Sequence, residues 1–102
     1  MKFQLVLQFP AAGMRQFDGL VALEEDLIQN LPPTSEVDGH DFESGEFNIF
    51  VFTDHPRDTF DAARKLINKS PFQHELRAAY RERGKEEYVI SWPEHLEEFR
   101  VA

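Results

Sequence analysis

The residues whose side chains can do chemistry gather in one stretch, from Val37 to Pro56. It reads VDGHDFESGEFNIFVFTDHP and holds two His, three Asp, two Glu and one Asn around an apolar run. Imidazole and carboxylate groups bind divalent metals and transfer protons. In a strand, Asp38 and His40 share one face while Asp41 points to the other. Asp38 and His40 are therefore weak candidate metal ligands, one short of the usual catalytic zinc set.

The same stretch has a simpler interpretation as a sheet edge, a solvated turn and the start of a helix. Charged side chains are usually solvated, and they keep exposed sheet edges from aggregating. Asp54, or Thr53 before it, is typical of a helix cap with Pro56 in the first turn. The chain has no Gly-rich phosphate loop, nucleophile elbow or His-Glu-x-x-His pair. We therefore expect neither a cofactor nor a metal, and no catalytic residue can be assigned.

Hydrophobic periodicity predicts the elements that position these residues. Alternating apolar residues predict strands at 2–9, 36–42, 47–53 and 87–92. Helical spacing predicts helices at 15–31 and from about Pro56 to Ser70. On the first helix, Glu24, Glu25 and Asp26 are expected away from the buried face.

Two short segments need a specific backbone, and one segment is ambiguous. Gly39 predicts a bulge, and Gly45 predicts a tight turn between two strands. Residues 71–83 fit either a second short helix or a helical turn followed by a strand from about Arg77. We favour the helical turn and the strand.

The order β-α-β-β-α-β, with one further C-terminal strand possible, predicts an α+β fold of the ferredoxin-like plait type. Right-handed crossovers place both helices on one face of an antiparallel sheet. Residues 1–93 would form this single domain, and 94–102 an acidic C-terminal tail. The strands at 2–9 and 47–53 are the most apolar and are expected at the centre of the sheet.

One face of the two central strands predicts an interaction surface. If Phe47, Ile49 and Val51 face the helices, amides and aromatic rings line the helix-free face. This predicted surface comprises Gln4, Gln8, Asn48, Phe50 and Phe52, with the acidic hairpin residues Asp41, Glu43 and Glu46. Exposed rings beside amides would form a platform for a protein, a small ligand or a second copy of the chain. The opposite orientation stays open, because both faces of residues 47–53 are apolar.

The charge distribution indicates which classes of partner the chain can bind. The net charge is −8, and residues 1–56 hold ten acids against two basic residues. Residues 57–85 hold eight basic residues against four acids, a run that is usually a solvated face. An acidic chain disfavours nucleic acid and anionic membranes, because both are bound through basic patches. It permits a basic protein partner or a homodimer.

The composition and the hydropathy of the chain also indicate its cellular compartment. The absence of Cys excludes a disulfide framework and a thiolate site, and it fits a reducing compartment. The first residues lack the pattern of a signal peptide, and no segment approaches the ~18 apolar residues of a membrane span. We expect a cytoplasmic protein.

One motif carries a resemblance. The segment D-G-H-D-F-E-S-G-E-F-N-I-F, the T-D-x-P that follows it and Y-x-x-x-W-P near the C-terminal end resemble a family of small bacterial proteins of about this length. The family has no assigned activity, and the resemblance covers most of the chain. It implies a bacterial cytoplasmic domain and no catalytic residue.

Three hypotheses of function follow. The first is a non-catalytic binding or regulatory module that acts through protein contacts or self-association. The second is an acidic antagonist of a basic toxin or nuclease, favoured by charge complementarity. The third is a metal-dependent enzyme that uses His40 and the neighbouring carboxylates, which would need a pocket lined by these groups.

Overall fold

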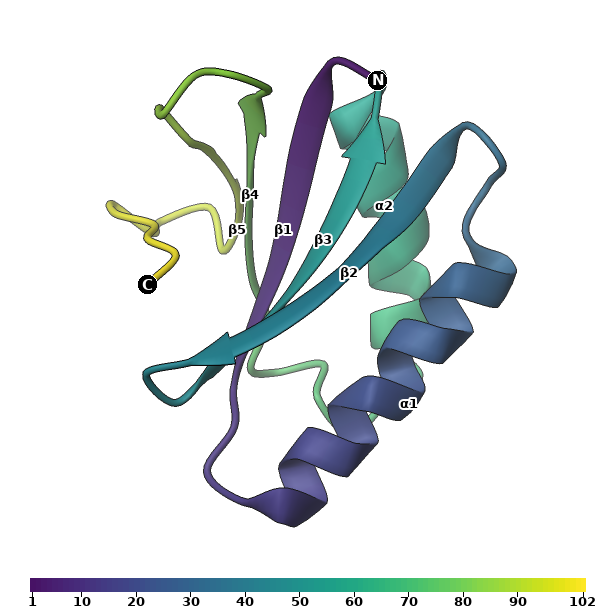
Figure 1. Cartoon of the computed structure of the whole chain (residues 1–102), viewed down its shortest axis with the longest axis vertical. Helices are drawn as coiled ribbons and strands as arrows, with labels where there is room; N and C mark the ends of the chain where they lie inside the picture. Colours follow the sequence, from purple (N-terminus) through teal and green to yellow (C-terminus); the bar gives the residue numbers. More distant parts are fainter.

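The computed structural model describes residues 1–102 and contains a five-stranded antiparallel sheet with two helices (Figure 1). The elements are β1 (Phe3–Pro10), α1 (Met14–Asn30), β2 (Ser35–Glu43), β3 (Glu46–Thr53), α2 (Pro56–Ile67), β4 (Arg77–Glu82) and β5 (Val89–Trp92). The strand order is β2-β3-β1-β4-β5, so the two apolar strands β1 and β3 are interior. The predicted α+β plait is confirmed, and β5 is the additional C-terminal strand.

The hydrophobic core lies between one face of the sheet and both helices. From the sheet it receives Leu5, Leu7, Phe9, Phe47, Ile49 and Val51, all fully buried. From the helices it receives Leu20, Leu23, Leu27, Phe60, Ala63 and Ile67. Burial of such side chains contributes about 1.5–3 kcal/mol each relative to exposure. The predicted placement of both helices on one face follows from this shared core.

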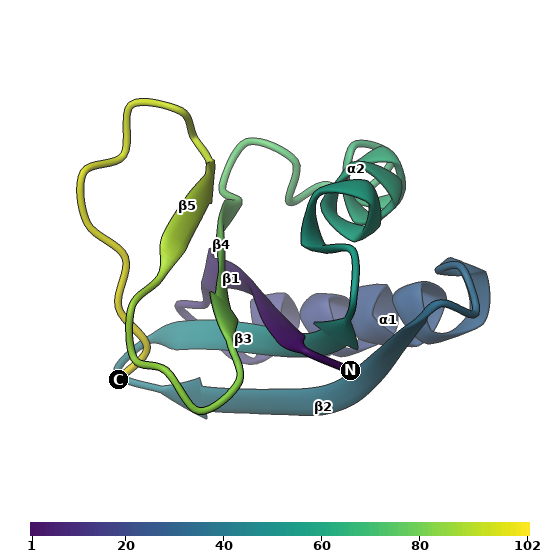
Figure 2. The ribbon, with the colours of Figure 1, turned by 90° about the horizontal axis from the view of Figure 1, so that it is seen from above.

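The sheet is strongly twisted, and the C-terminal segment lies on its other side. Figure 2 shows β4 and β5 running steeply across β2 and β3, with α2 on one side of β4 and the chain end on the other. Residues 93–102 form neither a helix nor a strand. This irregular segment contacts the sheet at Gln8 of β1, whose side chain donates a hydrogen bond to the Arg100 carbonyl.

The β2–β3 connection is a two-residue turn in which both residues have positive φ, 56° at Ser44 and 76° at Gly45. Such turns match the twist of the strands that they join. The predicted bulge is also present, because the register of β2 against β3 shifts between Val37 and Gly39. This shift leaves Asp38 without a partner residue on β3, and it changes which β2 side chains share a face.

The expected cap of α2 is wrong. Its N-cap is His55, which makes no side-chain capping bond, although Pro56 does occupy the first helical turn. The Thr53 hydroxyl instead accepts a hydrogen bond from the His55 N–H at 2.9 Å. The Asp54 carboxylate accepts one from the Lys2 N–H at 2.8 Å. The two side chains thus bind backbone N–H groups at the start of α2 and at the start of the chain.

The ambiguous segment has the structure that we favoured. Residues 71–75 form turns, and β4 begins at Arg77. The last strand begins at Val89, two residues later than the alternation predicts, because the β4–β5 connection is longer than a tight turn. Neither α1 nor α2 combines the length and apolar character that a membrane-spanning helix requires.

The turn provides a test of the fold. We expect Gly45→Ala to lower the free energy of unfolding by about 1–2 kcal/mol, because a Cβ is disfavoured at positive φ. Ser44→Asn should raise it, since Asn tolerates this conformation better than Ser. Urea denaturation of both variants measures the effect. A neutral Gly45→Ala would contradict the assigned turn.

Candidate interaction surfaces

The eight residues of the predicted surface do share one face of the sheet. In the register, Asp41 pairs with Asn48 and Asn48 with Gln8, while Phe52 pairs with Gln4. Phe47, Ile49 and Val51 face the helices, as the core shows. The orientation that the sequence left open is therefore resolved, and the helix-free face carries the amides.

A row of hydrogen bonds crosses this face. The Asn48 amide donates to the Asp41 carboxylate at 3.0 Å, and the Gln8 amide donates to the Asn48 carbonyl oxygen at 3.0 Å. The second N–H of the Gln8 amide donates to the backbone carbonyl of Arg100 at 2.7 Å. A buried amide without partners would cost about 1–3 kcal/mol. The row thus satisfies both amides and attaches the C-terminal segment to the sheet.

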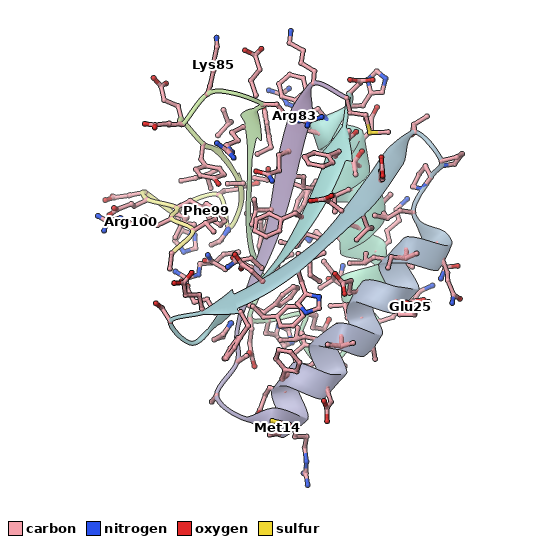
Figure 3. The ribbon with its side chains drawn as sticks, viewed as in Figure 1. Met14, Glu25, Arg83, Lys85, Phe99 and Arg100 are labelled. Carbon is pink, nitrogen blue, oxygen red and sulfur yellow. The ribbon has the colours of Figure 1, made fainter.

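The expectation that this face is an exposed platform is wrong for its middle, whereas Gln4, Phe50 and Phe52 remain partly exposed. Gln8 is 1% exposed, and Asn48 and Val6 are 0% exposed, although no helix covers them. The cover comes from residues 83–102, whose Arg83 and Phe99 are labelled in Figure 3. The Arg83 guanidinium lies 4.2 Å from the centre of the Phe52 ring.

Aromatic rings form part of the same cover. The Tyr88 and Phe99 rings lie 5.1 Å apart, and the Arg81 guanidinium lies 5.8 Å from the Tyr88 ring. Burial raises the pKa of the Tyr88 phenol above its usual value, Arg81 opposes this shift and the charge of Asp41 adds to it. Tyr88 is therefore held over the face, near groups from both β4 and β2.

The arginines of β4 make contacts within the molecule. Arg77 forms an ion pair with Glu46 at 3.1 Å, and Arg81 donates to the Gln4 side chain at 3.0 Å. Glu82 pairs with Lys85 at 3.1 Å and with Lys2 at 3.4 Å, and these partners lower the pKa of its carboxyl group. This part of the basic stretch is thus not a free cationic surface.

The opposite edge of the sheet is formed by β2 and flanked by α1 (Figure 1). Three apolar residues of α1, spaced seven apart, are exposed there: Met14 (77%), Val21 (37%) and Ile28 (52%). Phe42 of β2 is 48% exposed and packs edge-on against Phe17 of α1 at 5.6 Å. A hollow of about 450 Å³ lies here, lined by Ala11, Ala12, Gly13, Met14, Phe17, Asp18 and Phe42.

Exposed acidic side chains lie on the same two elements as these apolar residues. On β2, Glu36, Asp38 and Glu43 are exposed, and on the outer side of α1 the exposed acids are Asp18 and Glu25. Asp26, by contrast, lines a hollow with Leu66 and Lys69 on the α2 side of the helix. Figure 3 shows Glu25 on the outer side of α1 and Met14 at the N-terminal end of the helix. We call the outer edge of β2 together with the exposed side of α1 the acidic edge.

Behind the acidic edge, His40 pairs with a residue that the sequence did not indicate. Its Nδ1 lies 2.7 Å from the Glu24 carboxylate, and its ring stacks on Phe47 with centres 4.6 Å apart. Glu24 is only 8% exposed, so its expected position away from the buried face is wrong. Helical spacing could have indicated this burial, because Glu24 is four residues after Leu20 and three before Leu27 and so lies on the buried stripe.

The weak candidate ligands Asp38 and His40 are not brought together with a third ligand. No group of three or more His, Asp or Glu side chains is arranged to hold a metal ion. Asp38, the other candidate ligand, lies at the bulge of β2. The second carboxylate oxygen of Glu24 is buried without a hydrogen-bond partner. The Glu24–His40 pair is thus a polar contact between α1 and β2.

Two hollows adjoin α2. One, of about 360 Å³, is lined by Phe3, Asp54, His55, Pro56, Arg57, Asp58 and Tyr80. The other, of about 370 Å³, lies where the Arg64 guanidinium stacks on Trp92 at 3.6 Å, and Asp61 and Glu94 also line it. Each hollow mixes both signs of charge, so neither selects an ionic ligand by its charge.

The Glu24–His40 contact predicts a stability effect. His40→Ala should lower the free energy of unfolding by about 2–3 kcal/mol, because it leaves the buried Glu24 carboxylate unpaired. Replacing both partners, as in Glu24→Leu with His40→Phe, should recover most of that loss. Urea denaturation measures all three proteins, with His74→Ala as the exposed control. A double variant no more stable than His40→Ala would contradict this account.

Tyr88 predicts a loss of stability in alkali. Its pKa in the folded chain is raised, so this group's contribution is complete below the unfolded pKa of about 10 and is lost as pH rises through the folded pKa. Stability should therefore fall above pH about 10, and Tyr88→Phe should remove part of that fall. Denaturation midpoints at pH about 8 to 11 measure it. Identical pH profiles for the two proteins would show that Tyr88 is not held as described.

Comparisons with known proteins identify no relative of this chain. No protein family matches the sequence, and neither the curated proteins nor the solved structures contain a match.

Proposed function

We propose that the protein is a non-catalytic binding module that engages a basic region of a protein partner through its acidic edge. The observation that carries this proposal is the charge of the α1–β2 half of the domain. Residues 14–43, from the start of α1 to the end of β2, contain eight Asp and Glu residues and one basic residue, Arg15. A field of one sign on one edge steers an oppositely charged partner and raises its association rate.

The acids of this edge are free to meet a partner. None of the ion pairs in the structure involves Glu36, Asp38 or Glu43 of β2. Arg77 and two of the lysines, by contrast, are paired with Glu46 and Glu82. The acidic charge is therefore not neutralised inside the molecule, and an external basic surface would be its natural counterpart.

Self-association is a weaker proposal for two reasons. The helix-free face, which would be the platform for a homodimer, is partly covered by residues 83–102 of the same chain, and its amides Gln8 and Asn48 are buried. Two copies joined through the acidic edge would bring like charges together, which is destabilising.

An antagonist of a basic enzyme, such as a toxin or a nuclease, is a special case of the same proposal. The exposed Phe42 and Met14 favour it, because tight inhibitory interfaces need apolar anchors inside a polar rim. It predicts that the partner loses its activity in the complex, whereas a regulatory or adaptor role does not require this.

The proposal predicts a salt-sensitive complex with a basic protein. Native mass spectrometry of the protein purified at low salt from the cells that produce it should detect the partner. Asp38→Lys with Glu43→Lys should weaken the complex about tenfold or more at low salt, and less at high salt. The matched control, Glu94→Lys with Glu97→Lys, reverses two exposed acids outside the acidic edge and should have little effect.

Three results would count against the proposal. The first is recovery of the chain without any partner at low salt, and the second is recovery of an acidic partner. The third is an equal loss of binding in the two charge-reversal variants. The last result would mean that net charge alone, and not the acidic edge, governs the interaction.

A further inference from the structure

The outer side of β2 is an unpaired sheet edge. β2 is nine residues long and forms ladder hydrogen bonds only with β3. An edge of this kind presents backbone N–H and C=O groups that an extended segment of another chain can pair with.

An apolar stripe lies beside this edge. Met14, Val21 and Ile28 recur every seven residues along α1, so they occupy one line on its surface. This line neighbours the one formed by Phe17 and Glu24, which contact Phe42 and His40 of β2. A strand added to β2 would therefore cover exposed apolar side chains of α1 on its helix side.

The other side of the added strand would meet acids. The register places Glu36, Asp41 and Glu43 on the helix-free side of β2, opposite Phe52, Asn48 and Glu46. Val37, His40 and Phe42 point to the helix side, as the contacts of His40 and Phe42 with Phe17 show. The edge thus differs in chemistry between its two sides, apolar toward α1 and acidic away from it.

We propose that β2 accepts an extended basic segment of the partner as a sixth strand of the sheet. This inference rests on the proposed function and adds the binding mode and the chemistry of the partner. The segment alternates apolar residues, which cover Val21, Ile28 and the hollow at Met14 and Phe42, with Lys or Arg, which meet the acids. Alternation is required because successive side chains of a strand point to opposite faces.

A second copy of the chain does not fit this edge. β2 carries four acidic residues and no Lys or Arg, so pairing β2 with β2 would align like charges along both strands. A basic segment removes that repulsion and gains the same backbone hydrogen bonds.

Two peptides of equal charge test the inference. One alternates five Lys with four Val, which matches the nine residues of β2, and the other places the five Lys before the four Val. The alternating peptide should bind the full chain at least about fivefold more tightly, because only it can bury its Val side chains against α1 while its Lys meet the acids. Binding is followed by fluorescence anisotropy at low salt, and amide exchange of β2 by NMR.

Substitutions in the apolar stripe of α1 test the same inference. Val21→Gln with Ile28→Gln leaves the charge unchanged and should abolish the preference for the alternating peptide. Val89→Gln, which replaces an exposed apolar residue on the opposite edge of the sheet, should preserve it. The β2 amides should exchange more slowly with the alternating peptide bound, since they gain hydrogen-bond partners.

The outcomes separate this inference from the proposed function. Equal binding of the two peptides, with no slowing of β2 exchange, would overturn strand addition and leave the acidic edge as a purely electrostatic surface. If neither peptide bound, strand addition would also be overturned. The proposed complex with a basic partner would still be tested separately, by native mass spectrometry and the charge-reversal variants. A dimer of the chain alone with protected β2 amides would assign the edge to a second copy and overturn the basic segment.

Discussion

The pairing of β1 with β3 is the contact on which the other elements depend. Both strands are interior to the sheet and bury side chains on both faces, so these side chains must find apolar or hydrogen-bonding partners in two directions. On one face, Leu5, Leu7, Ile49 and their neighbours pack against the helices. On the other face, the buried amides of Gln8 and Asn48 must be satisfied, and they recruit Asp41 and the Arg100 carbonyl. The position of the C-terminal segment follows from that requirement.

Closing the helix-free face leaves the molecule asymmetric. In a plait with an open sheet face, that face is the natural binding surface, but here residues 83–102 cover part of it and contact Gln8 and Phe52. One edge of the sheet adjoins these same residues through β5, whereas β2 at the other edge adjoins only β3 and α1. The surface available to a partner is therefore an edge, and an edge offers backbone groups as well as side chains.

The electrostatics follow the same asymmetry. The arginines of β4 lie over a face with polar partners, and Arg77 and Arg81 bind Glu46 and Gln4. The exposed acids Glu36, Asp38 and Glu43 of β2 lie at the periphery and form no ion pair with a basic residue of the chain. A carboxylate in water costs the fold little, so these acids remain unpaired without destabilising it. Only Glu24 is drawn into the interior, and it takes His40 as its partner.

Much of this architecture could be predicted from the residues alone, because periodicity reports how each element is buried. The strands, both helices, the bulge at Gly39, the turn at Gly45 and the shared face of the eight polar and aromatic residues all follow from local pattern and register. What local pattern does not contain is the partner of each group across the fold. The Glu24–His40 pair, the hydrogen bond of Asp54 with the Lys2 N–H, and the cover over Gln8 and Asn48 join segments distant in sequence. Such contacts depend on how the elements pack and on where an irregular segment finds hydrogen bonds. For this reason the residues identify the surfaces, and their three-dimensional packing decides which one stays open.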